Sequence, residues 1–302
     1  MKINFNSSLL SLATITLLTF SGCGSDSSNN NSVDSYVGNA NEVSNDVIAK
    51  QRAVLATSIV GKDVGAQAPR DIDSVAGANN KTATTAPAAT AMNLCNIHFH
   101  KSAEHKGGEF TKYAGNGDGY GYETGYKYTG ILTASESSSF EGGEVCTSDN
   151  GSLHSGDTIE VHYVYSSDDV QPGATLGACL AADRTDGTQP ALRVEAQVYV
   201  LVNDEQALNF ETLTEITHNG FYQAPNIPKN IGTAIQYEGS TTGPGYNEKI
   251  SPFQVTWNVS PKVAKVSIKT VGEWCHNNNF DEHHAHPVRN LVINPNLLSE
   301  IK

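Results

Sequence analysis

Basic residues are scarce in this sequence, where 19 Lys and Arg residues stand against 32 Asp and Glu residues and give a net charge of −13. No basic stripe interrupts this charge, and an acidic surface repels phosphate backbones, so the composition argues against nucleic acid as a partner. Long apolar runs are lacking beyond the N-terminus, which argues against a polytopic membrane protein. Methionine occurs only twice, whereas there are 27 glycines and 12 tyrosines. This composition is typical of a mainly β, exported protein rather than of a helical bundle.

The spacing of the five cysteines also argues against one kind of site. Because no C-x-x-C pair occurs, a zinc site built from cysteines is not expected. Cys23 apart, an even number of cysteines remains, and in an exported chain this predicts two disulfides. Three connectivities are open to the candidates, which are Cys95, Cys146, Cys179 and Cys275. Proximity in the sequence favours Cys146–Cys179 together with Cys95–Cys275.

Residues 1–22 combine a basic start at Lys2, a short apolar stretch and small residues before Cys23, which is typical of a secretory signal. The Ser-Gly-Cys sequence resembles a bacterial lipobox, which implies cleavage before Cys23 and attachment of lipid to it. Ordinary signal cleavage, with Cys23 removed or idle, is the alternative. Residues 23–41 predict a flexible polar tether. We therefore expect a lipoprotein that faces the periplasm or the cell surface and contacts the membrane only through its N-terminal lipid anchor.

The rest of the chain, residues 42–302, is expected to form one domain of the mainly β class. The pattern predicts a central, largely antiparallel twisted sheet with a few short helices, one of them within residues 42–60. Alternating apolar residues between Gly-rich turns predict strands at 94–100, 157–166, 191–202, 253–260 and 263–271. The glycine- and tyrosine-rich region 107–130 predicts loop and hairpin.

Two histidines lie two residues apart on the first predicted strand. Residues two apart on a strand point the same way, so Asn96, His98 and His100 should share one face, and Cys95, Ile97 and Phe99 the other. Two imidazoles at such positions can bind one metal ion. Alone, the H-x-H pattern is weak evidence and is better explained by histidines that bind no metal.

A third histidine lies inside the predicted strand 157–166, where Glu160, His162 and Val164 share a face. A carboxylate two residues before a histidine can hold the ring N–H that does not bind a metal. Three neutral imidazoles with one open position are typical of catalytic zinc. The two segments together therefore predict a metal site.

The other histidines predict less. His105 is expected to be hydrogen-bonded and partly buried, and His154 and His218 to lie on the surface. We expect His276, His283, His284 and His286 to lie together in a solvated loop without a metal-binding role. Metal storage by this cluster is the competing hypothesis, and it would need several metal ions per chain.

Both histidine segments resemble strands of a known enzyme family. Asn96-Ile97-His98-Phe99-His100 resembles the Q-F-H-F-H strand of alpha-class carbonic anhydrases, and Glu160-Val161-His162-Tyr163-Val164 resembles their E-L-H-L-V strand. Residues 237–244 and 255–259 are similar to their Y-x-G-S-x-T-T-P-P and V-x-W-x-V, and residues 67–72 and 286–290 to their Q-S-P-x-x-I and Q-P-L-N-x-R. Met92–Lys106, with its Glu-His pair three residues after the histidine strand, resembles the delta-class signature more closely.

The resemblance implies an alpha-carbonic-anhydrase-like fold for residues 42–302. It also implies reversible hydration of CO2 to bicarbonate and a proton by a zinc-bound hydroxide, with one Zn2+ per chain that cobalt or cadmium can replace. Its implied ligands are His98, His100 and His162, oriented by Asn96 and Glu160.

The same resemblance assigns catalytic roles to Thr241, which orients the hydroxide, and to Glu104, which accepts the threonine proton. Val164 and Trp257 would form the apolar wall for CO2. The threonine segment departs from the alpha pattern, with Gly243 in place of the first proline and one residue missing after Ser240. Thr242 is therefore the alternative to Thr241.

Two other functions remain open beside CO2 hydration. A catalytically silent relative would keep the fold as a binding domain, and a zinc hydrolase would use the same hydroxide on small esters. The lack of H-E-x-x-H argues against a metalloprotease. The oligomeric state, the proton-transfer residue and the direction of the reaction in the cell are left open by the sequence.

Overall fold

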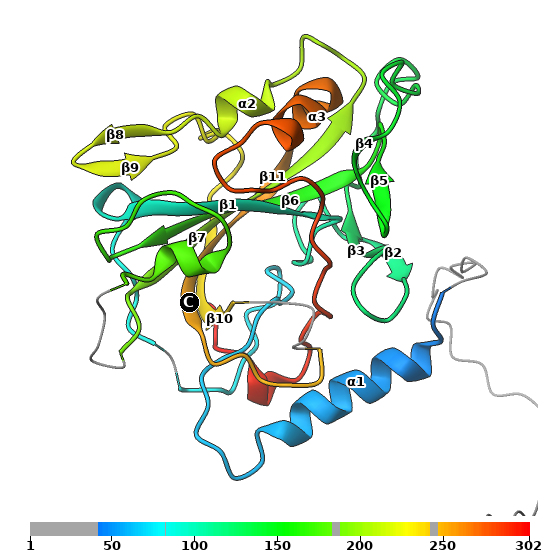
Figure 1. Cartoon of the computed structure of the whole chain (residues 1–302). Coiled ribbons are helices and arrows are strands. Elements are labelled where there is room, and N and C mark those ends of the chain that lie inside the picture. The colour runs from blue at the N-terminus through cyan, green and yellow to red at the C-terminus, as the bar shows by residue number, and fades with distance from the viewer. Residues whose placement is uncertain (1–41, 82, 183–187, 242–246) are drawn as a thin grey trace, which may run out of the picture. The chain divides into compact units, whose positions relative to one another are not determined.

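Five strands form a mixed sheet in the order β1-β6-β7-β11-β10 (Figure 1). The computed structural model describes residues 42–81, 83–182, 188–241 and 247–302. The sheet strands are β1 (Asn93–Lys101), β6 (Thr158–Ser166), β7 (Leu192–Val202), β10 (Ile235–Ser240) and β11 (Gln254–Ser267). All neighbours are antiparallel except β7 and β11, which are parallel. The mainly β fold with a largely antiparallel central sheet is therefore confirmed.

Smaller elements surround this sheet. The hairpins are β2 (Lys112–Asn116) with β3 (Thr124–Lys127), β4 (Val145–Ser148) with β5 (Gly151–Leu153), and β8 (Thr217–Asn219) with β9 (Phe221–Gln223). The helices are α1 (Asn45–Ser58), α2 (Phe210–Leu213) and α3 (Ile268–His276), with 3-10 turns η1 (Ala89–Ala91), η2 (Leu176–Cys179) and η4 (Pro295–Leu297). Among the described residues, no helix has both the length and the apolarity that a membrane span requires.

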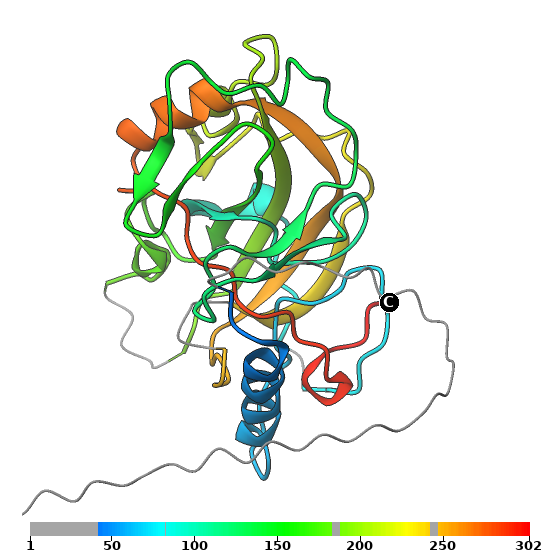
Figure 2. The same cartoon turned by 90° about the vertical axis from the view of Figure 1, so that its right-hand side faces the viewer.

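Each face of the sheet has its own core, because its middle strands are buried on both sides. All nine residues of β6 are buried. One cluster packs Phe99, Tyr163 and Trp274 between the sheet and α2 and α3. The other packs Val164, Val194 and Trp257 on the opposite face. Figure 2 shows the C-terminal segment, in red, beside helix α1, where Leu55 packs with Val292.

One predicted strand is wrong. Residues 253–260 and 263–271 were expected to be two strands, but β11 runs continuously to Ser267, and α3 follows directly. The register against β7 shifts between Val259 and Val263, where Pro261 has no N–H to donate to the ladder. The second half of the prediction failed because Ile268, Val271 and Trp274 recur at helical spacing and are buried together.

The expected face of Cys95 is also wrong. The register between β1 and β6 shifts between Leu94 and Asn96, so Cys95 is an extra residue in a β-bulge. A bulge re-aims the side chain it contains. Cys95 consequently packs with Val164 and not with Ile97 and Phe99.

The two predicted disulfides are present, but their predicted pairing is wrong. Cys95 is bonded to Cys179, and Cys146 is bonded to Cys275. Cys146 on β4 lies against α3, which carries Cys275, whereas the bulge turns Cys95 toward η2 on the other face. Proximity in the sequence failed because the fold separates Cys146 from Cys179 by the whole sheet. The predicted signal, Cys23 and the tether lie outside the described residues.

Candidate metal centre

Three imidazoles meet where β1 and β6 pair. His98 is the direct antiparallel partner of His162, and His100 is the partner of Glu160. The rings of His98 and His162 lie with centroids 5.0 Å apart, and those of His100 and His162 4.8 Å apart. One nitrogen of each of the three rings lies within 4.8 Å of the others. The structure thus brings together the three predicted ligands through ordinary strand pairing.

On β1, the second nitrogen of each ring has a fixed hydrogen-bond partner. His98 Nδ1 donates to Asn96 Oδ1 at 2.7 Å, and His100 Nδ1 donates to the carbonyl oxygen of Pro287 at 2.9 Å. Each Nε2 is then the unprotonated nitrogen and faces the other rings. His100 Nε2 is buried and has no hydrogen-bond partner among the described residues. A buried acceptor without a partner is costly, and a metal ion at this position would satisfy it.

His162 is oriented by a buried carboxylate. Its Nε2 donates to Glu160 Oε1 at 2.8 Å, which turns Nδ1 toward His98 Nε2, 3.2 Å away. Glu160 Oε1 also accepts from His105 Nδ1 at 2.7 Å, and the Tyr237 hydroxyl donates to His105 Nε2 at 2.7 Å. His105 is hydrogen-bonded through both ring nitrogens as expected, but it is fully buried rather than partly buried. The close grouping of His105, Glu160 and His162 is therefore a hydrogen-bond network.

The electrostatics favour neutral rings at His98 and His100 beside an ionised Glu160 carboxylate. Burial lowers the pKa of His98 well below its ordinary 6.5, and the neighbouring imidazoles lower it further. Burial also lowers the pKa of His100, to about 4. Burial alone would raise the pKa of Glu160, but the charge and hydrogen bonds of His105 and His162 hold it well below its usual range. Three neutral imidazoles with oriented lone pairs are the donor set of a catalytic zinc site, and these residues fit that ion.

Glu104 lies beside the imidazoles of His100 and His162. Its Oε1 accepts from the backbone N–H of Arg289 at 2.9 Å, and its Oε2 lies 3.8 Å from His100 Nε2 and 3.9 Å from His162 Nε2. Its backbone N–H donates to Glu160 Oε2 at 2.8 Å. The carboxylate is therefore placed next to the candidate ligands while its backbone helps to hold one of their partners.

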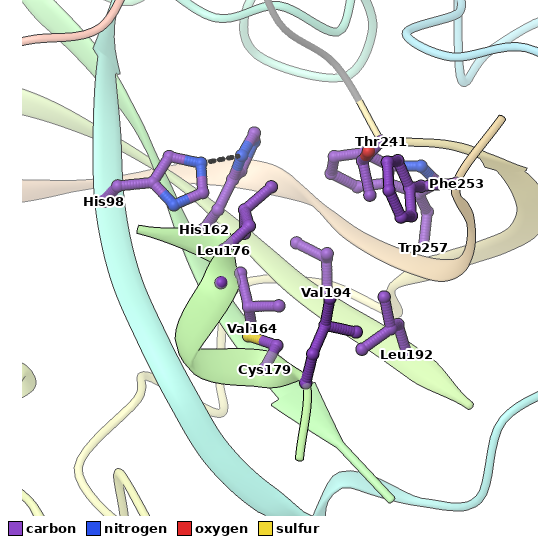
Figure 3. Close-up of a pocket in the computed structure, with 12 residues that line it drawn as sticks. His98, His162, Val164, Leu176, Cys179, Leu192, Val194, Thr241, Phe253 and Trp257 are labelled. Atoms are coloured by element: carbon purple, nitrogen blue, oxygen red, sulfur yellow. Dashed lines mark hydrogen bonds between the residues drawn. The ribbon is translucent and has the colours of Figure 1, made fainter. Parts of the chain in front are cut away.

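Thr241 follows the last residue of β10 and lies on the wall of the cavity beside the imidazoles. Its backbone N–H donates to the carbonyl oxygen of Phe253 at 2.8 Å, and the side chain lines the same cavity as His98 and His162 (Figure 3). Thr242, the alternative to Thr241, lies outside the described residues. The pairing of either threonine with Glu104 stays a prediction.

The cavity beside His98 and His162 has a volume of about 260 Å³. Val164 and Trp257, the two predicted wall residues, both line it (Figure 3). The rest of the apolar wall was not predicted from the sequence. It is formed by Leu176, Cys179, Leu180, Leu192, Val194 and Phe253. Five of these six residues come from the segment after β6 and from the start of β7, neither of which carries a motif.

His286 is nearer to the candidate ligands than a solvated loop would place it. Its ring centroid lies 5.3 Å from that of His98, and its Nε2 is 2.6 Å from Glu282 Oε2. Its backbone N–H donates to the carbonyl oxygen of Phe99 at 2.8 Å. The remaining members of the predicted loop cluster, His276, His283 and His284, are exposed, as are His154 and His218.

Comparison with known proteins adds the family. No curated protein matches the chain. Among solved structures, an alpha-carbonic anhydrase of Photobacterium profundum shares 16% identity over 75% of this chain and 86% of its own, with a TM-score of 0.25. A hyperthermostable carbonic anhydrase from an active hydrothermal vent chimney shares 14% identity over 79% and 90%, with a TM-score of 0.27. A third is the alpha-carbonic anhydrase of Thermovibrio ammonificans in complex with sulfanilamide, at 13% identity over 74% and 83% and a TM-score of 0.24. TM-scores this low support no conclusion about the function of this chain.

The match to a family model is more extensive. The model of delta carbonic anhydrases matches residues 89–270, which is more than half of the 302 residues. The matched stretch includes β1 and β6 with all three imidazoles, as well as Glu104 and Thr241. The chain therefore belongs to the delta carbonic anhydrase family.

Proposed function

We propose that the protein catalyses the reversible hydration of CO2 to bicarbonate and a proton, with one Zn2+ held by His98, His100 and His162. One observation carries the proposal: the free nitrogens of three imidazoles, two of them buried and that of His98 half-buried, lie close together beside an apolar cavity. When bound to three neutral imidazoles, Zn2+ is a Lewis acid that lowers the pKa of water to about 7 and so supplies the nucleophile at neutral pH. Cobalt or cadmium can take the same donor set.

Three groups of the chain hold the imidazoles in the tautomers and orientations that can bind a metal ion. Asn96 and the Pro287 carbonyl accept the Nδ1 protons of His98 and His100, and Glu160 accepts the Nε2 proton of His162. Each bond fixes both the tautomer and the plane of its ring. Lowered pKa values of His98 and His100 keep protons from competing for the same lone pairs at neutral pH.

Glu104 and Thr241 are proposed to orient the nucleophile. An ionised Glu104 can only accept, so a threonine hydroxyl that donates to it has its oxygen left to accept a hydrogen from the nucleophile. This arrangement aims a lone pair of the nucleophile at the substrate before reaction, and such preorganised hydrogen bonds act on the barrier. Arg289 contributes by holding Glu104 Oε1 through its backbone N–H.

CO2 is small and apolar, and the cavity matches that chemistry. Val164 and Trp257 place apolar surface next to His162, and the Trp257 Nε1–H is occupied by the carbonyl oxygen of Ser240 at 3.1 Å. The wall beside the imidazoles therefore offers CO2 contact surface without a competing donor from the indole. Bicarbonate, which is charged, is held less well by such a wall, and this favours its release.

Metal content and CO2 hydration, measured on the same sample of the full chain, test the proposal. We expect one zinc per chain and stopped-flow hydration activity that disappears on chelation and returns with Zn2+. His162→Ala should lose both, whereas the control His218→Ala, at an exposed histidine, should retain both. Full zinc without hydration would instead identify a silent relative, and hydrolysis of small esters without CO2 hydration would identify a hydrolase. Several zinc ions that survive in His162→Ala would support metal storage.

We further propose that residues 42–302 form the catalytic domain of an exported lipoprotein, tethered by lipid on Cys23. Two disulfides in the described residues are compatible with an oxidising compartment. A carbonic anhydrase placed there would interconvert CO2 and bicarbonate at the cell envelope.

A further inference from the structure

One wall of the cavity belongs to neither β1 nor β6. Residues 167–181, which follow β6 and which we call the strap, contain η2, and Leu176, Gly177, Cys179 and Leu180 of the strap line the cavity beside His98 and His162. Figure 3 shows Leu176 reaching over Val164 from this segment. The shape of the cavity next to the candidate ligands therefore depends on how the strap is fastened.

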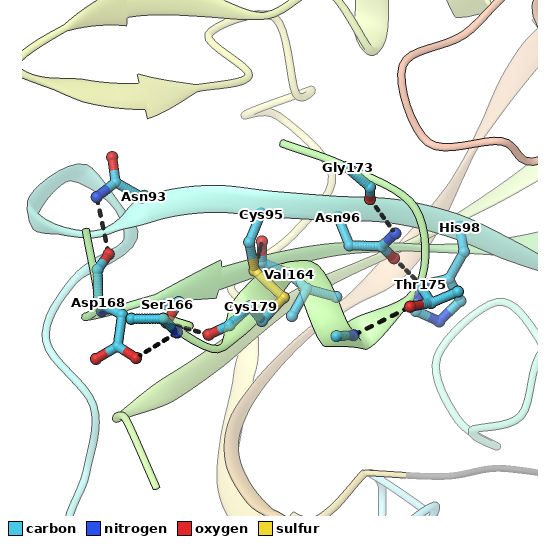
Figure 4. The surroundings of a disulfide bond; sticks show 12 residues. Asn93, Cys95, Asn96, His98, Val164, Ser166, Asp168, Gly173, Thr175 and Cys179 are labelled. Carbon is cyan, nitrogen blue, oxygen red and sulfur yellow. Dashed lines mark hydrogen bonds between the residues drawn. A yellow bond between two sulfur atoms is a disulfide. The ribbon is translucent and has the colours of Figure 1, made fainter. Parts of the chain in front are cut away.

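The strap is joined to β1 at Cys95. This residue directly precedes Asn96, which accepts the hydrogen bond from His98 Nδ1. The bulge turns Cys95 out of the Ile97 and Phe99 face, and Cys95 forms a disulfide with Cys179 of the strap (Figure 4). The backbone N–H of Gly173 donates to the Cys95 carbonyl oxygen at 3.0 Å. Without the bulge, the Cys95 side chain would point to the opposite side of the sheet, and this cross-link could not form.

The strap also fixes the amide of Asn96. Asn96 Nδ2 donates to the carbonyl oxygen of Gly173 at 3.1 Å, and Asn96 Oδ1 accepts from His98 Nδ1 at 2.7 Å (Figure 4). Because the carbonyl of Gly173 accepts only, it selects the NH2 end of the amide and leaves the oxygen toward the imidazole. The orientation and the tautomer of His98 are thus set through Asn96 by a backbone group of the strap.

The conformation of the strap depends on its anchors. Thr175, which caps η2, has a φ of 59°, a left-handed conformation that β-branched residues rarely adopt. Beyond the disulfide, Ser166 Oγ donates to the Cys179 carbonyl oxygen at 2.7 Å, and the Ala181 N–H donates to Asp168 Oδ2 at 3.0 Å. A turn that is unfavourable by itself persists only where the surroundings hold it.

We propose that the strap is a positioning element for His98, held in place by the Cys95–Cys179 disulfide, so that full metal affinity is reached only when this disulfide has formed. The inference rests on the proposed function in that it takes the three imidazoles as the metal ligands. Loss of the disulfide frees the Gly173 carbonyl from its place beside Asn96, and the amide can then rotate and present its NH2 group to His98. The consequence is a chain that acquires its metal tightly only in an oxidising compartment.

The second disulfide provides a matched control. Cys146–Cys275 ties β4 to α3 in the cluster on the opposite face of the sheet. The double variants C95S/C179S and C146S/C275S remove one disulfide each and the same atoms. Metal-free full-length proteins are titrated with Co2+, followed by its absorption spectrum, and with Zn2+ in competition with a chromophoric chelator.

We expect C95S/C179S to bind metal about 10- to 100-fold more weakly than the unsubstituted chain, the usual loss when the partner of a ligating histidine is disturbed. C146S/C275S should stay within about twofold, the ordinary error of additivity. If C95S/C179S does not fold, the folded C146S/C275S protein is titrated before and after reduction with tris(2-carboxyethyl)phosphine, which then acts on Cys95–Cys179 alone. Cobalt–thiolate absorption would show whether freed thiols bind the metal.

A double-mutant cycle separates positioning from a general loss of stability. Asn96→Ala should weaken binding by a similar factor, and adding C95S/C179S to it should cost little more, because both act through the same bond to His98. Additive losses, or unchanged affinity in C95S/C179S, would overturn the proposal while leaving a metal site in the unsubstituted chain intact. Absence of metal binding by the unsubstituted chain would instead overturn the proposed function.

Discussion

The three imidazoles are held by three different kinds of group. A side-chain amide holds His98, a carboxylate holds His162, and a main-chain carbonyl holds His100. Because Glu160 is ionised and accepts four hydrogen bonds, it can polarise His162 more strongly than the neutral groups polarise the other two rings. His162 should therefore be the most basic of the three donors.

The pair formed by Glu104 and Thr241 should affect turnover and not metal binding. We expect Thr241→Ala and Glu104→Gln each to keep one zinc per chain and to lose hydration rate by about 100- to 1000-fold, the usual effect of removing one preorganised hydrogen bond. The double variant should be little worse than either single variant, because the two groups act as a unit. Stopped-flow rates and metal analysis on the same samples provide the measurement.

Thr242→Ala is the control for this pair. A near-normal rate in Thr241→Ala with a large loss in Thr242→Ala would move the orienting role by one residue. Normal rates in both threonine variants would rule out the orienting pair, and loss of zinc in Glu104→Gln would make Glu104 part of the metal-holding network.

Tyr237 closes the hydrogen-bond chain behind His162. In Tyr237→Phe, the buried His105 Nε2 loses its donor, and a buried acceptor without a partner costs about 1–3 kcal/mol. We expect the free energy of unfolding to fall by that amount in urea titrations, with one zinc per chain retained. Tyr120→Phe, at a side chain that is 74% exposed, should change neither quantity. Equal stability of the two variants would show that the Tyr237–His105 bond contributes nothing to the fold.

At the residue scale, the sequence predicts the candidate metal ligands better than the groups that hydrogen-bond to them. His98, His100 and His162 were predictable because their spacing matches the period of a strand, and the fold then pairs the two strands in register. The Pro287 carbonyl was not predictable, since it is a main-chain group 187 residues away from His100. The nearness of His286 to His98 has the same origin, a C-terminal segment that passes beside β1.

At the element scale, β1 carries two candidate ligands on one face and core residues on the other. Phe99 lies between His98 and His100 in sequence, is fully buried, and packs edge-on against Phe210 and at a tilt against Trp274 of α3. The position of the two ligands therefore depends on a core that contains no metal ligand. Elements on the far side of the sheet thus help to fix the geometry of the site.

We expect Phe99→Ala to lower the free energy of unfolding by about 3–5 kcal/mol, the usual cost of removing a buried phenylalanine ring. Metal affinity should fall as well, because β1 loses its anchor to α2 and α3. Phe221→Ala, at a side chain that is 40% exposed, is the comparison. Urea unfolding of the metal-free proteins and Co2+ titration measure the two effects. A loss of stability with unchanged affinity would show that strand pairing with β6 alone positions the ligands.

Strands were predictable from the sequence where a local run of apolar residues marks them. The core strands β1, β6 and β7 follow from apolar residues in strand-length runs, and the structure has them within one residue at each end of the prediction. The bulge at Cys95 was not predictable, because one extra residue in a strand leaves the apolar pattern almost unchanged. The disulfide pairing depends on that bulge and on which face of the sheet each cysteine occupies. It was therefore not predictable from the sequence either.

At the scale of the molecule, two large cores of the described residues share one sheet, and a smaller cluster joins Leu55 to Val292, Leu297 and Leu298. The face with α2 and α3 contains the larger aromatic cluster and Cys146–Cys275. The opposite face contains the three imidazoles, the cavity and Cys95–Cys179. Each face therefore has its own cross-link, and only one of them touches the candidate site.

The attachment of the whole molecule to the cell envelope is the last property to test. We expect the unsubstituted chain to fractionate with membranes and to incorporate labelled fatty acid, because buried acyl chains stabilise attachment by about 0.8 kcal/mol per CH2 group. Cys23→Ser removes the acceptor of the lipid, so it should leave the protein unprocessed or release it into the soluble fraction. Ser25→Ala, two residues beyond Cys23, should behave like the unsubstituted chain. Unchanged fractionation of Cys23→Ser together with an absence of lipid label would show that Cys23 is no anchor, and CO2 hydration by the released protein would show that catalysis does not require the membrane.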